Sequence, residues 1–272
     1  MISNMYLNFY NLKEFPFNIT PDPKFLYFAK QHREAFDYLM YGITNRKGFI
    51  ELTGEVGSGK TTTVRAILAN LPDNIETALI LNPSLTETQL LRAILNDLGL
   101  KPKGRDRLSY IELLNEFLLE KNAEGKNVAL FIDEAQDLTP KVMEQVRLLS
   151  NLETDQHKLI QIVLCGQPEL KDRLAREDLR QLRQRITVRY HIEPLSLENT
   201  KHYIEHRLLI AGNKKDRLIF DMSAINEVYN YSKGSPRVIN AVCDNALLAG
   251  YASGALIVTR EHVIKSIEHI EG

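Results

Sequence analysis

Short apolar runs alternate with longer stretches of helical periodicity from the N-terminus of the chain to Pro194. The apolar runs predict strands at 48–53, 76–82, 127–133, 159–165 and 187–193. Helices are expected at about 31–45, 60–71, 86–99, 107–124, 140–152 and 168–178. Buried strands that take turns with helices are typical of a parallel sheet with helices on its faces. The expected fold class is therefore α/β, with a five-stranded parallel sheet flanked by helices.

After Pro194 the strand signal stops and only helical periodicity continues. Helices are expected near 196–211, 221–232, 236–251 and 259–269, and the breaks between them contain Gly212, Gly234 and Gly254. Glycine commonly ends a helix because it adopts left-handed backbone angles without strain. The change of pattern predicts an α/β domain over 1–194 and a smaller, all-helical domain over 195–272.

The charges of the chain nearly cancel, with 34 Lys and Arg against 35 Asp and Glu and a formal net charge of -1. This balance argues against a surface built as a whole to attract nucleic acid, although a local basic patch would be compatible with it. The two cysteines, Cys165 and Cys243, have no partners at metal-ligand spacing. We expect both to be buried free thiols.

No secretory leader or membrane span is expected. The first residues carry no charged lead followed by an apolar stretch, and no run of about eighteen apolar residues occurs without a charge. The sequence therefore predicts a soluble, cytoplasmic protein with no span of its own, unless it is a fragment of a longer chain.

A glycine-rich segment follows the first expected strand and opens the next helix. It fits the pattern G-x-x-x-x-G-K-[ST], whose backbone amides wrap a phosphate at the positive end of a helix. Lys60 would place its charge on the β- and γ-phosphates of ATP, and Thr61 would offer its hydroxyl to Mg²⁺. The residues expected to bind the nucleotide are Gly54, Glu55, Val56, Gly57, Ser58, Gly59, Lys60, Thr61 and Thr62.

A second motif is the apolar strand that ends in Asp133 and Glu134. A strand of this length brings both carboxylates to the carboxyl edge of a parallel sheet, where such sheets bind ligands. Asp133 is therefore expected as a partner of Mg²⁺, usually through water. Glu134 is expected as the base that polarises the attacking water.

The combination of motifs resembles the AAA+ superfamily, and within it the ATPases of the ExeA/GspA type that are associated with type II secretion and pilus biogenesis. The segments that carry the resemblance are Phe15-Pro16-Phe17, Pro21-Asp22-Pro23, Phe25-Leu26-Tyr27, His32-Arg33-Glu34-Ala35, GEVGSGKTT from Gly54, Leu81-Asn82-Pro83, IDEAQ at 132–136, Cys165-Gly166-Gln167-Pro168-Glu169-Leu170, Leu182-Arg183-Gln184-Arg185-Ile186 and Gly234-Ser235-Pro236-Arg237. It implies a P-loop (AAA+) sheet with a helical lid, and a homo-oligomer whose ATP site is completed by a neighbouring subunit. It also implies a partner in envelope or secretion machinery, at the inner face of the inner membrane.

The resemblance also implies roles for single residues. Gln167 resembles the first sensor, which helps to hold the attacking water, and Asn82 resembles the polar residue that hydrogen-bonds the catalytic glutamate. For both, a satisfied loop amide is the alternative interpretation. Arg237 resembles the second sensor, which reaches from the lid to the nucleotide.

An arginine finger is expected among the basic residues that precede and enter the fifth strand. By position in the LRQRI motif we favour Arg185, and then Arg183, because a guanidinium fork suits a spread phosphoryl charge. A solvated basic helix face is the alternative for this cluster. The aromatic segment 15–27 lies near the adenine in the resemblance, or else packs as an arm on the core.

Three points leave the function open. ExeA-type proteins commonly continue into a membrane span and a peptidoglycan-binding region that do not follow here, so the chain is either a shorter branch or a cut one. The rival function is a DNA-binding transposition regulator similar to TnsC and MuB, for which the basic residues Lys101, Lys103, Arg105 and Arg107 would contact phosphates. A third alternative is a nucleotide-binding scaffold that hydrolyses poorly.

Overall fold

The chain divides into two compact units. The computed structural model describes residues 5–18, 22–81, 83–102, 104–155, 157–215 and 217–272. The first unit, here called the helical unit, comprises Met1–Gln31, Glu55–Thr62 and Glu193–Gly272. The second, here called the sheet unit, comprises His32–Gly54 and Thr63–Ile192. The unit boundary at Ile192 lies close to the change of sequence pattern at Pro194.

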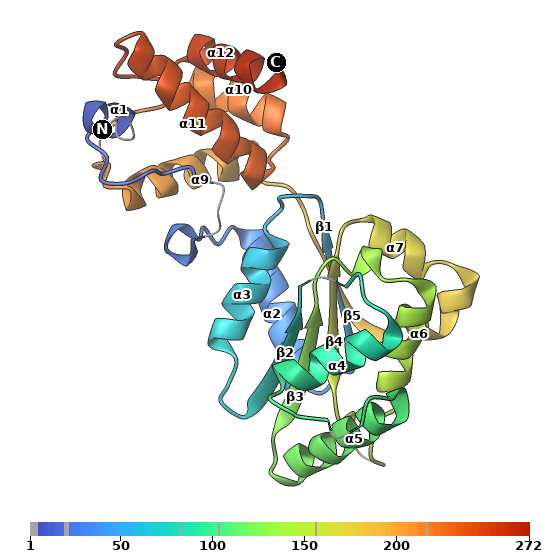
Figure 1. The fold of residues 1–272 in the computed structure, drawn as a ribbon. Coiled ribbons are helices and arrows are strands. Elements are labelled where there is room, and N and C mark those ends of the chain that lie inside the picture. Colours follow the sequence, from blue (N-terminus) through green and yellow to red (C-terminus); the bar gives the residue numbers. More distant parts are fainter. Residues whose placement is uncertain (1–4, 19–21, 82, 103, 156, 216) are drawn as a thin grey trace. The chain divides into compact units, whose positions relative to one another are not determined.

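The sheet unit is built on five parallel strands (Figure 1). They are β1 (Phe49–Gly54), β2 (Ile75–Ile80), β3 (Asn127–Ile132), β4 (Gln161–Gly166) and β5 (Ile186–Ile192). Their order is β2-β3-β4-β1-β5, and every neighbouring pair is parallel. Helices connect the strands, as parallel pairing requires. All five expected strands are confirmed, with ends that differ by one or two residues.

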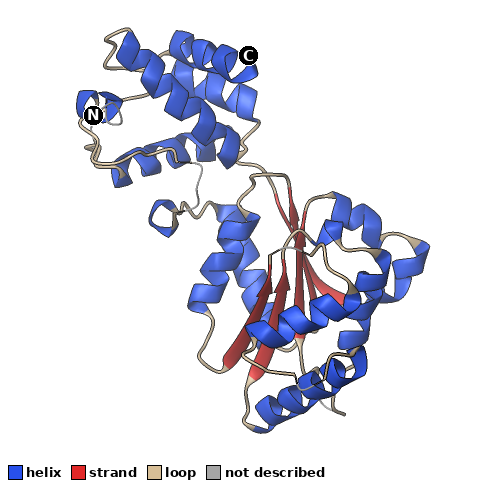
Figure 2. Cartoon of the chain, in the orientation of Figure 1, coloured by secondary structure: helices blue, strands red, loops and turns tan. Residues whose placement is uncertain are grey.

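Helices cover both faces of this sheet (Figures 1 and 2). On one face α2 (Lys30–Thr44) and α3 (Lys60–Asn70) pack on β1, β3 and β4 through residues such as Ile50 and Phe131. On the other face lie α4 (Glu87–Asp97), α5 (Arg107–Ala123) and α6 (Pro140–Leu149), packed on residues such as Leu130. Successive strand residues point to opposite faces, so the two apolar clusters share the same strands.

The starts of several helices follow from capping side chains. The hydroxyl of Thr139 accepts a hydrogen bond from the Val142 amide, and Pro140 occupies the first turn of α6, as the sequence predicts. Thr86 forms a capping box with Gln89 at the start of α4. Asp106 accepts from the Ser109 amide at the start of α5.

The segment between β4 and β5 differs from its prediction. The single helix expected over 168–178 ends early, and the segment forms α7 (Glu169–Leu174), the 3₁₀ turn η3 (Glu177–Leu179) and α8 (Arg180–Arg185). Leu174, Leu179 and Leu182 are all buried in the same apolar cluster. A turn after α7 brings the last two leucines to that cluster. The sequence predicts a helix only as far as 178 and no element over 179–185, where the structure has α8.

The helical unit contains α9 (Leu197–Ile210), α10 (Met222–Ser232), α11 (Pro236–Ala252) and α12 (Arg260–Glu271), which confirm the four helices expected after Pro194. The N-terminal segment adds α1 (Met5–Phe9) and the 3₁₀ turn η1 (Pro23–Phe25), neither of which was expected. Figure 2 shows helices and loops in this part of the chain.

The N-terminal segment packs with the helical unit. Leu7, Tyr10 and Phe17 are buried in one apolar cluster with the side chains of α9 to α12, and the Tyr10 hydroxyl donates to the Ala255 carbonyl oxygen at 2.9 Å. The sequence pattern predicts this segment to be part of the α/β domain, whereas the structure groups Met1–Gln31 with the helical unit. So short a segment cannot bury its own aromatic side chains, and periodicity does not say which neighbouring surface buries them.

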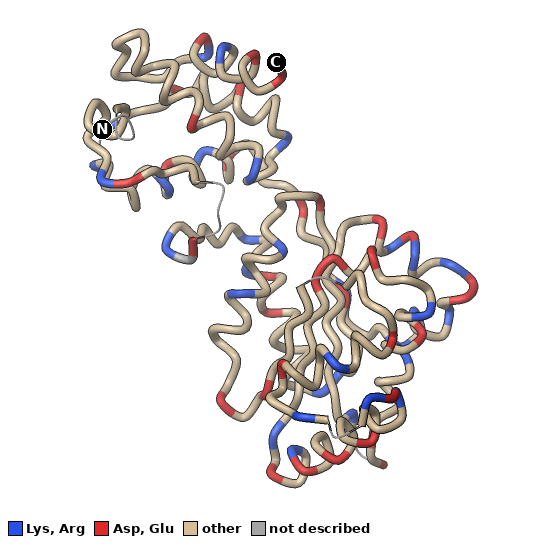
Figure 3. Tube along the Cα trace, viewed as in Figure 1, with Lys and Arg blue, Asp and Glu red and all other residues tan. Residues whose placement is uncertain are grey.

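Acidic and basic residues are intermixed along both units (Figure 3). This distribution agrees with the near-zero net charge of the chain. Within the described ranges, every helix is too short or too polar to traverse a lipid bilayer. Cys165 and Cys243 are buried free thiols, as expected, and burial raises the pKa of Cys243.

Candidate functional site

The glycine-rich segment forms a tight turn between β1 and α3. It continues from Gly54, the last residue of β1, and ends at Lys60, the first residue of α3. Gly57 and Gly59 have φ angles of +77° and +97°, which side chains rarely allow. The Lys60 ammonium donates to the Glu55 carbonyl oxygen at 3.0 Å. Gly57 and Gly59 therefore have the left-handed backbone angles that an anion-binding loop of this sequence pattern requires.

Residues of α11 lie directly against this loop, inside the helical unit. A β-carbon added at Gly57 would lie 2.7 Å from Cβ of Arg237 and 2.9 Å from Oγ of Ser235. The Ser235 hydroxyl donates to the Val56 carbonyl oxygen at 3.3 Å. The structure thus brings the expected second sensor, Arg237, to the loop, and it explains why position 57 needs a residue without a side chain.

The two expected carboxylates follow β3. Asp133 is buried, its amide donates to the Ile80 carbonyl oxygen, and its Oδ1 accepts from the Glu134 amide at 3.0 Å. Glu134 has left-handed backbone angles, φ 50° and ψ 39°, before the 3₁₀ turn η2 (Ala135–Asp137). A non-glycine residue in this region costs roughly 1–3 kcal/mol and is often found at functional sites.

Two amide side chains hold the carboxylate of Glu134. Its Oε2 accepts from Nε2 of Gln136 at 2.7 Å and from Nε2 of Gln167 at 3.3 Å. The backbone N–H of Gln167 donates in turn to Oε1 of Gln136 at 3.0 Å. The structure therefore brings Gln167 to Glu134. It also adds Gln136, a residue of the IDEAQ motif for which the sequence predicts no role.

Of the other expected residues, Asn82 lies outside the described part of the chain. Thr61 and Thr62 lie in the first turn of α3, and both are partly buried. Within the described ranges, no group of three or more His, Cys, Asp or Glu side chains could by itself hold a metal ion. Mg²⁺ usually binds through one or two protein oxygens together with substrate phosphates. The Thr61 hydroxyl and the buried Asp133 carboxylate are each oxygen ligands of the kind that Mg²⁺ accepts.

The candidate arginine fingers differ in their surroundings. Nη1 of Arg185 donates to Oγ of Ser150 at 2.5 Å and to Oδ1 of Asn151 at 2.6 Å, just beyond the end of α6. Nη1 of Arg183 makes a longer bond of 3.4 Å to the Ala175 carbonyl oxygen. Arg185 is therefore held by two short hydrogen bonds, whereas Arg183 makes one long one.

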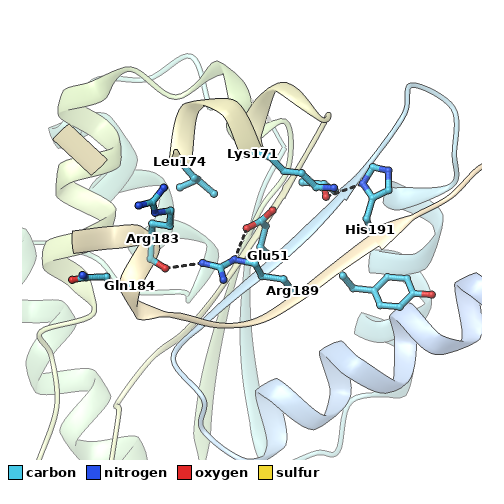
Figure 4. Close-up of a pocket in the computed structure, with 9 residues that line it drawn as sticks. Glu51, Lys171, Leu174, Arg183, Gln184, Arg189 and His191 are labelled. Atoms are coloured by element: carbon cyan, nitrogen blue, oxygen red, sulfur yellow. Dashed lines mark hydrogen bonds and ion pairs between the residues drawn. The ribbon is translucent and has the colours of Figure 1, made fainter. Parts of the chain in front are cut away.

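Arg183 lines an open cavity of about 600 Å³ over β1 and β5 (Figure 4). The floor contains Glu51, whose buried carboxylate accepts from Nε of Arg189 at 3.2 Å. Nη2 of Arg189 also donates to the Arg183 carbonyl oxygen at 2.7 Å. Lys171 from α7 adds a further cation to the lining, whereas Arg185 does not line this cavity. Arg183 is thus the more accessible of the two candidates.

Two sequence comparisons identify known proteins that resemble this chain. The model of the AAA domain matches residues 43–174. General secretion pathway protein A of Aeromonas hydrophila is 48% identical over 254 residues, which cover 92% of this chain. The match covers 46% of that relative, so the chain spans a little under half of the relative's length.

Solved structures with similar folds include ORC and Cdc6 proteins. The ORC2 protein of Aeropyrum pernix has a TM-score of 0.67 at 15% identity, covering 92% of this chain and 72% of that one. Drosophila ORC bound to DNA has a TM-score of 0.72 at 18% identity, covering 98% of this chain and 66% of that one. Cdc6p of Pyrobaculum aerophilum has a TM-score of 0.68 at 17% identity, covering 92% and 71%. At these identities the likeness concerns the fold alone.

Proposed function

The chain belongs to the AAA+ P-loop family, in the group of General secretion pathway protein A, and on this premise we propose that it binds MgATP and hydrolyses it as an assembly motor or switch of a bacterial secretion or pilus-like envelope system. A relative's name supports the secretion role, and the chain covers less than half of that relative. The proposed site of action is the cytoplasm, where ATP is available, at the inner face of the inner membrane.

One observation carries the proposal of hydrolysis. The neighbouring strands β3, β4 and β1 end at the same edge of the sheet. At that edge β3 supplies Asp133 and Glu134, β4 supplies Gln167, and β1 leads into the phosphate loop. Parallel sheets bind ligands at this edge, and a carboxylate held there suits general-base chemistry.

The proposed roles follow from the chemistry of each side chain. Lys60 and the loop amides would bind the phosphates, and Thr61 and Asp133 would hold Mg²⁺, which neutralises charge on the phosphates. Glu134 would take a proton from the attacking water while Gln167 orients that water. Arg237 would contact the nucleotide from α11, where its Cβ already lies against Gly57.

An arginine from a neighbouring subunit would complete the site, with Arg185 favoured and Arg183 as the alternative. A mixing experiment tests this arrangement. Glu134→Gln and Arg185→Ala proteins should each be inactive alone, because each lacks one half of the shared site. Mixed oligomers should recover roughly a quarter of wild-type activity, since random pairing restores that share of sites.

Arg180→Ala is the matched control, because Arg180 lies on the same short helix α8 and is exposed. This control should be active without mixing. No recovery in the mixture, at concentrations where the wild type is active, would refute a shared site that uses Arg185. Activity of Arg185→Ala alone, together with recovery by Arg183→Ala on mixing, would assign the finger to Arg183.

A second candidate function, ATP-dependent binding of DNA, is favoured by a basic cavity. Arg92, Lys101 and Arg105 line a cavity of about 640 Å³, and no acidic side chain is among the described residues of its lining. Lys103, which the sequence grouped with this loop, lies outside the described residues. Duplex DNA is the probe, with a non-hydrolysable ATP analogue present. Affinity that falls steeply with salt and is lost in Arg92→Ala and Arg105→Ala would support this function, and no binding at low salt would count against it.

A further inference from the structure

Among the described residues, Gln136 makes four hydrogen bonds beside Glu134. Its Nε2 donates to Oε2 of Glu134 at 2.7 Å and to Oδ2 of Asp137 at the longer distance of 3.4 Å, and its Oε1 accepts from the backbone N–H of Gln167 at 3.0 Å. Its carbonyl oxygen accepts from the guanidinium of Arg173. The residue is 8% exposed, and a β-carbon at Gly166 would lie only 2.8 Å from its Oε1. The side chain therefore has little room to adopt another position.

Gln167 is attached to Glu134 less firmly. Its Nε2 lies 3.3 Å from Oε2 of Glu134, which is 0.6 Å longer than the 2.7 Å contact from Gln136. Its side chain is also only partly buried. In the proposed function Gln167 orients the attacking water near the γ-phosphate. If Gln167 turns toward the nucleotide, it cannot also hold the carboxylate of Glu134. Gln136 is then the donor that keeps its hydrogen bond to that carboxylate.

We propose that Gln136 is a positioning residue for hydrolysis: it holds Oε2 of Glu134 through its amide, so that Oε1 is directed to the attacking water when Gln167 turns to the nucleotide. This inference rests on the proposed ATPase function. Both amides bind the same carboxylate oxygen, which leaves Oε1 as the oxygen that we assign to the water. The left-handed backbone of Glu134 fixes the other end of its side chain.

The test is a kinetic comparison of Gln136→Met with the wild type. Methionine has a similar length but no donor, so the carboxylate should lose its fixed position. We expect kcat to fall at least ten-fold while KM for ATP changes by less than about two-fold, because Gln136 does not contact the nucleotide in this account.

A double variant separates positioning from a merely structural role. If Gln136 acts only through Glu134, adding Gln136→Met to Glu134→Gln should cause no further loss of kcat. Gln145→Met is the matched control, because Gln145 is also a buried glutamine of the sheet unit, in α6, and should leave kcat unchanged. If Gln136→Met does not fold, Gln136→Asn keeps the amide with a shorter reach and should show an intermediate kcat.

Failure of this inference can be distinguished from failure of the proposed function. If the wild type hydrolyses ATP and the Gln136→Met protein has the same kcat, this inference is overturned and the proposed function stays intact. A further loss in the double variant, equal to the loss in the single variant, would also overturn it. A wild-type protein that does not hydrolyse ATP would overturn the proposed function and this inference with it.

Discussion

The substitution Gly57→Ala tests whether the phosphate loop has the shape described above. Gly57 combines a φ of +77° with close neighbours, since an added β-carbon would lie 2.7 Å from Cβ of Arg237. Cβ of Arg237 is attached directly to the backbone in the first turn of α11. It therefore cannot move aside by a change of side-chain rotamer. Either the loop or the start of α11 must move.

The expected loss of ATP affinity follows from two energetic costs, the left-handed backbone and the overlap with Arg237. An alanine with left-handed backbone angles costs about 1–2 kcal/mol. The overlap with Arg237 adds about 1 kcal/mol at the low end of overpacking costs. The free variant can relax its loop, but ATP binding requires the original shape. A penalty of about 2–3 kcal/mol then weakens ATP binding by roughly 30- to 150-fold.

Titration of each protein with MgATP, followed by calorimetry, measures this effect. Gly99→Ala is the control, because Gly99 has a similar φ of +74° but nothing within 4 Å of an added β-carbon. That variant should lose about 1–2 kcal/mol of stability and keep its ATP affinity. Equal ATP affinity of Gly57→Ala and wild type would show that the loop is not the phosphate site.

Three further substitutions test other contacts. Lys60→Ala should weaken ATP binding by roughly 10- to 100-fold, the value of a charge-assisted hydrogen bond, and unchanged affinity in calorimetry would exclude that role. Gly166→Ala should push aside Oε1 of Gln136 and lower kcat at constant KM, and a wild-type kcat in steady-state assays would contradict this. Burial raises the pKa of Asp244 above 3.8, while its hydrogen bond with Tyr6 opposes the shift. Below its ordinary pKa this carboxyl therefore contributes fully to the stability of the folded state. That contribution is lost as pH rises through the raised pKa. Asp244→Asn should therefore raise Tm at neutral pH and have less effect near pH 4, and a lower Tm at pH 7 would be the opposite result.

The parallel sheet could be predicted because its information is local. Each strand is a run of apolar residues that both layers of helices bury, and such runs remain visible without knowledge of their neighbours. The carboxylates at the end of β3 were predictable for the same reason, since Asp133 and Glu134 follow an apolar run directly. The motif GEVGSGKTT likewise lies in one continuous segment.

Other features depend on distant partners, and the sequence could not predict them. Gln136 acquires its position only because β4 ends beside η2, which brings Gln167 within reach. The aromatic side chains of Tyr10 and Phe17 could pack on several surfaces, and only the folded chain shows that α9 to α12 bury them. The bonds of Arg185 to Ser150 and Asn151 are equally invisible in the sequence.

The most direct measurement is the fate of MgATP bound to wild-type protein and to Glu134→Gln. The wild type should bind ATP in a manner that depends on Mg²⁺ and convert it to ADP. Glu134→Gln should bind ATP with similar affinity and hydrolyse it roughly 100- to 10,000-fold more slowly, because only the general base is lost. A wild type that takes up no ATP, or a Glu134→Gln protein that hydrolyses it at the wild-type rate, would contradict this account.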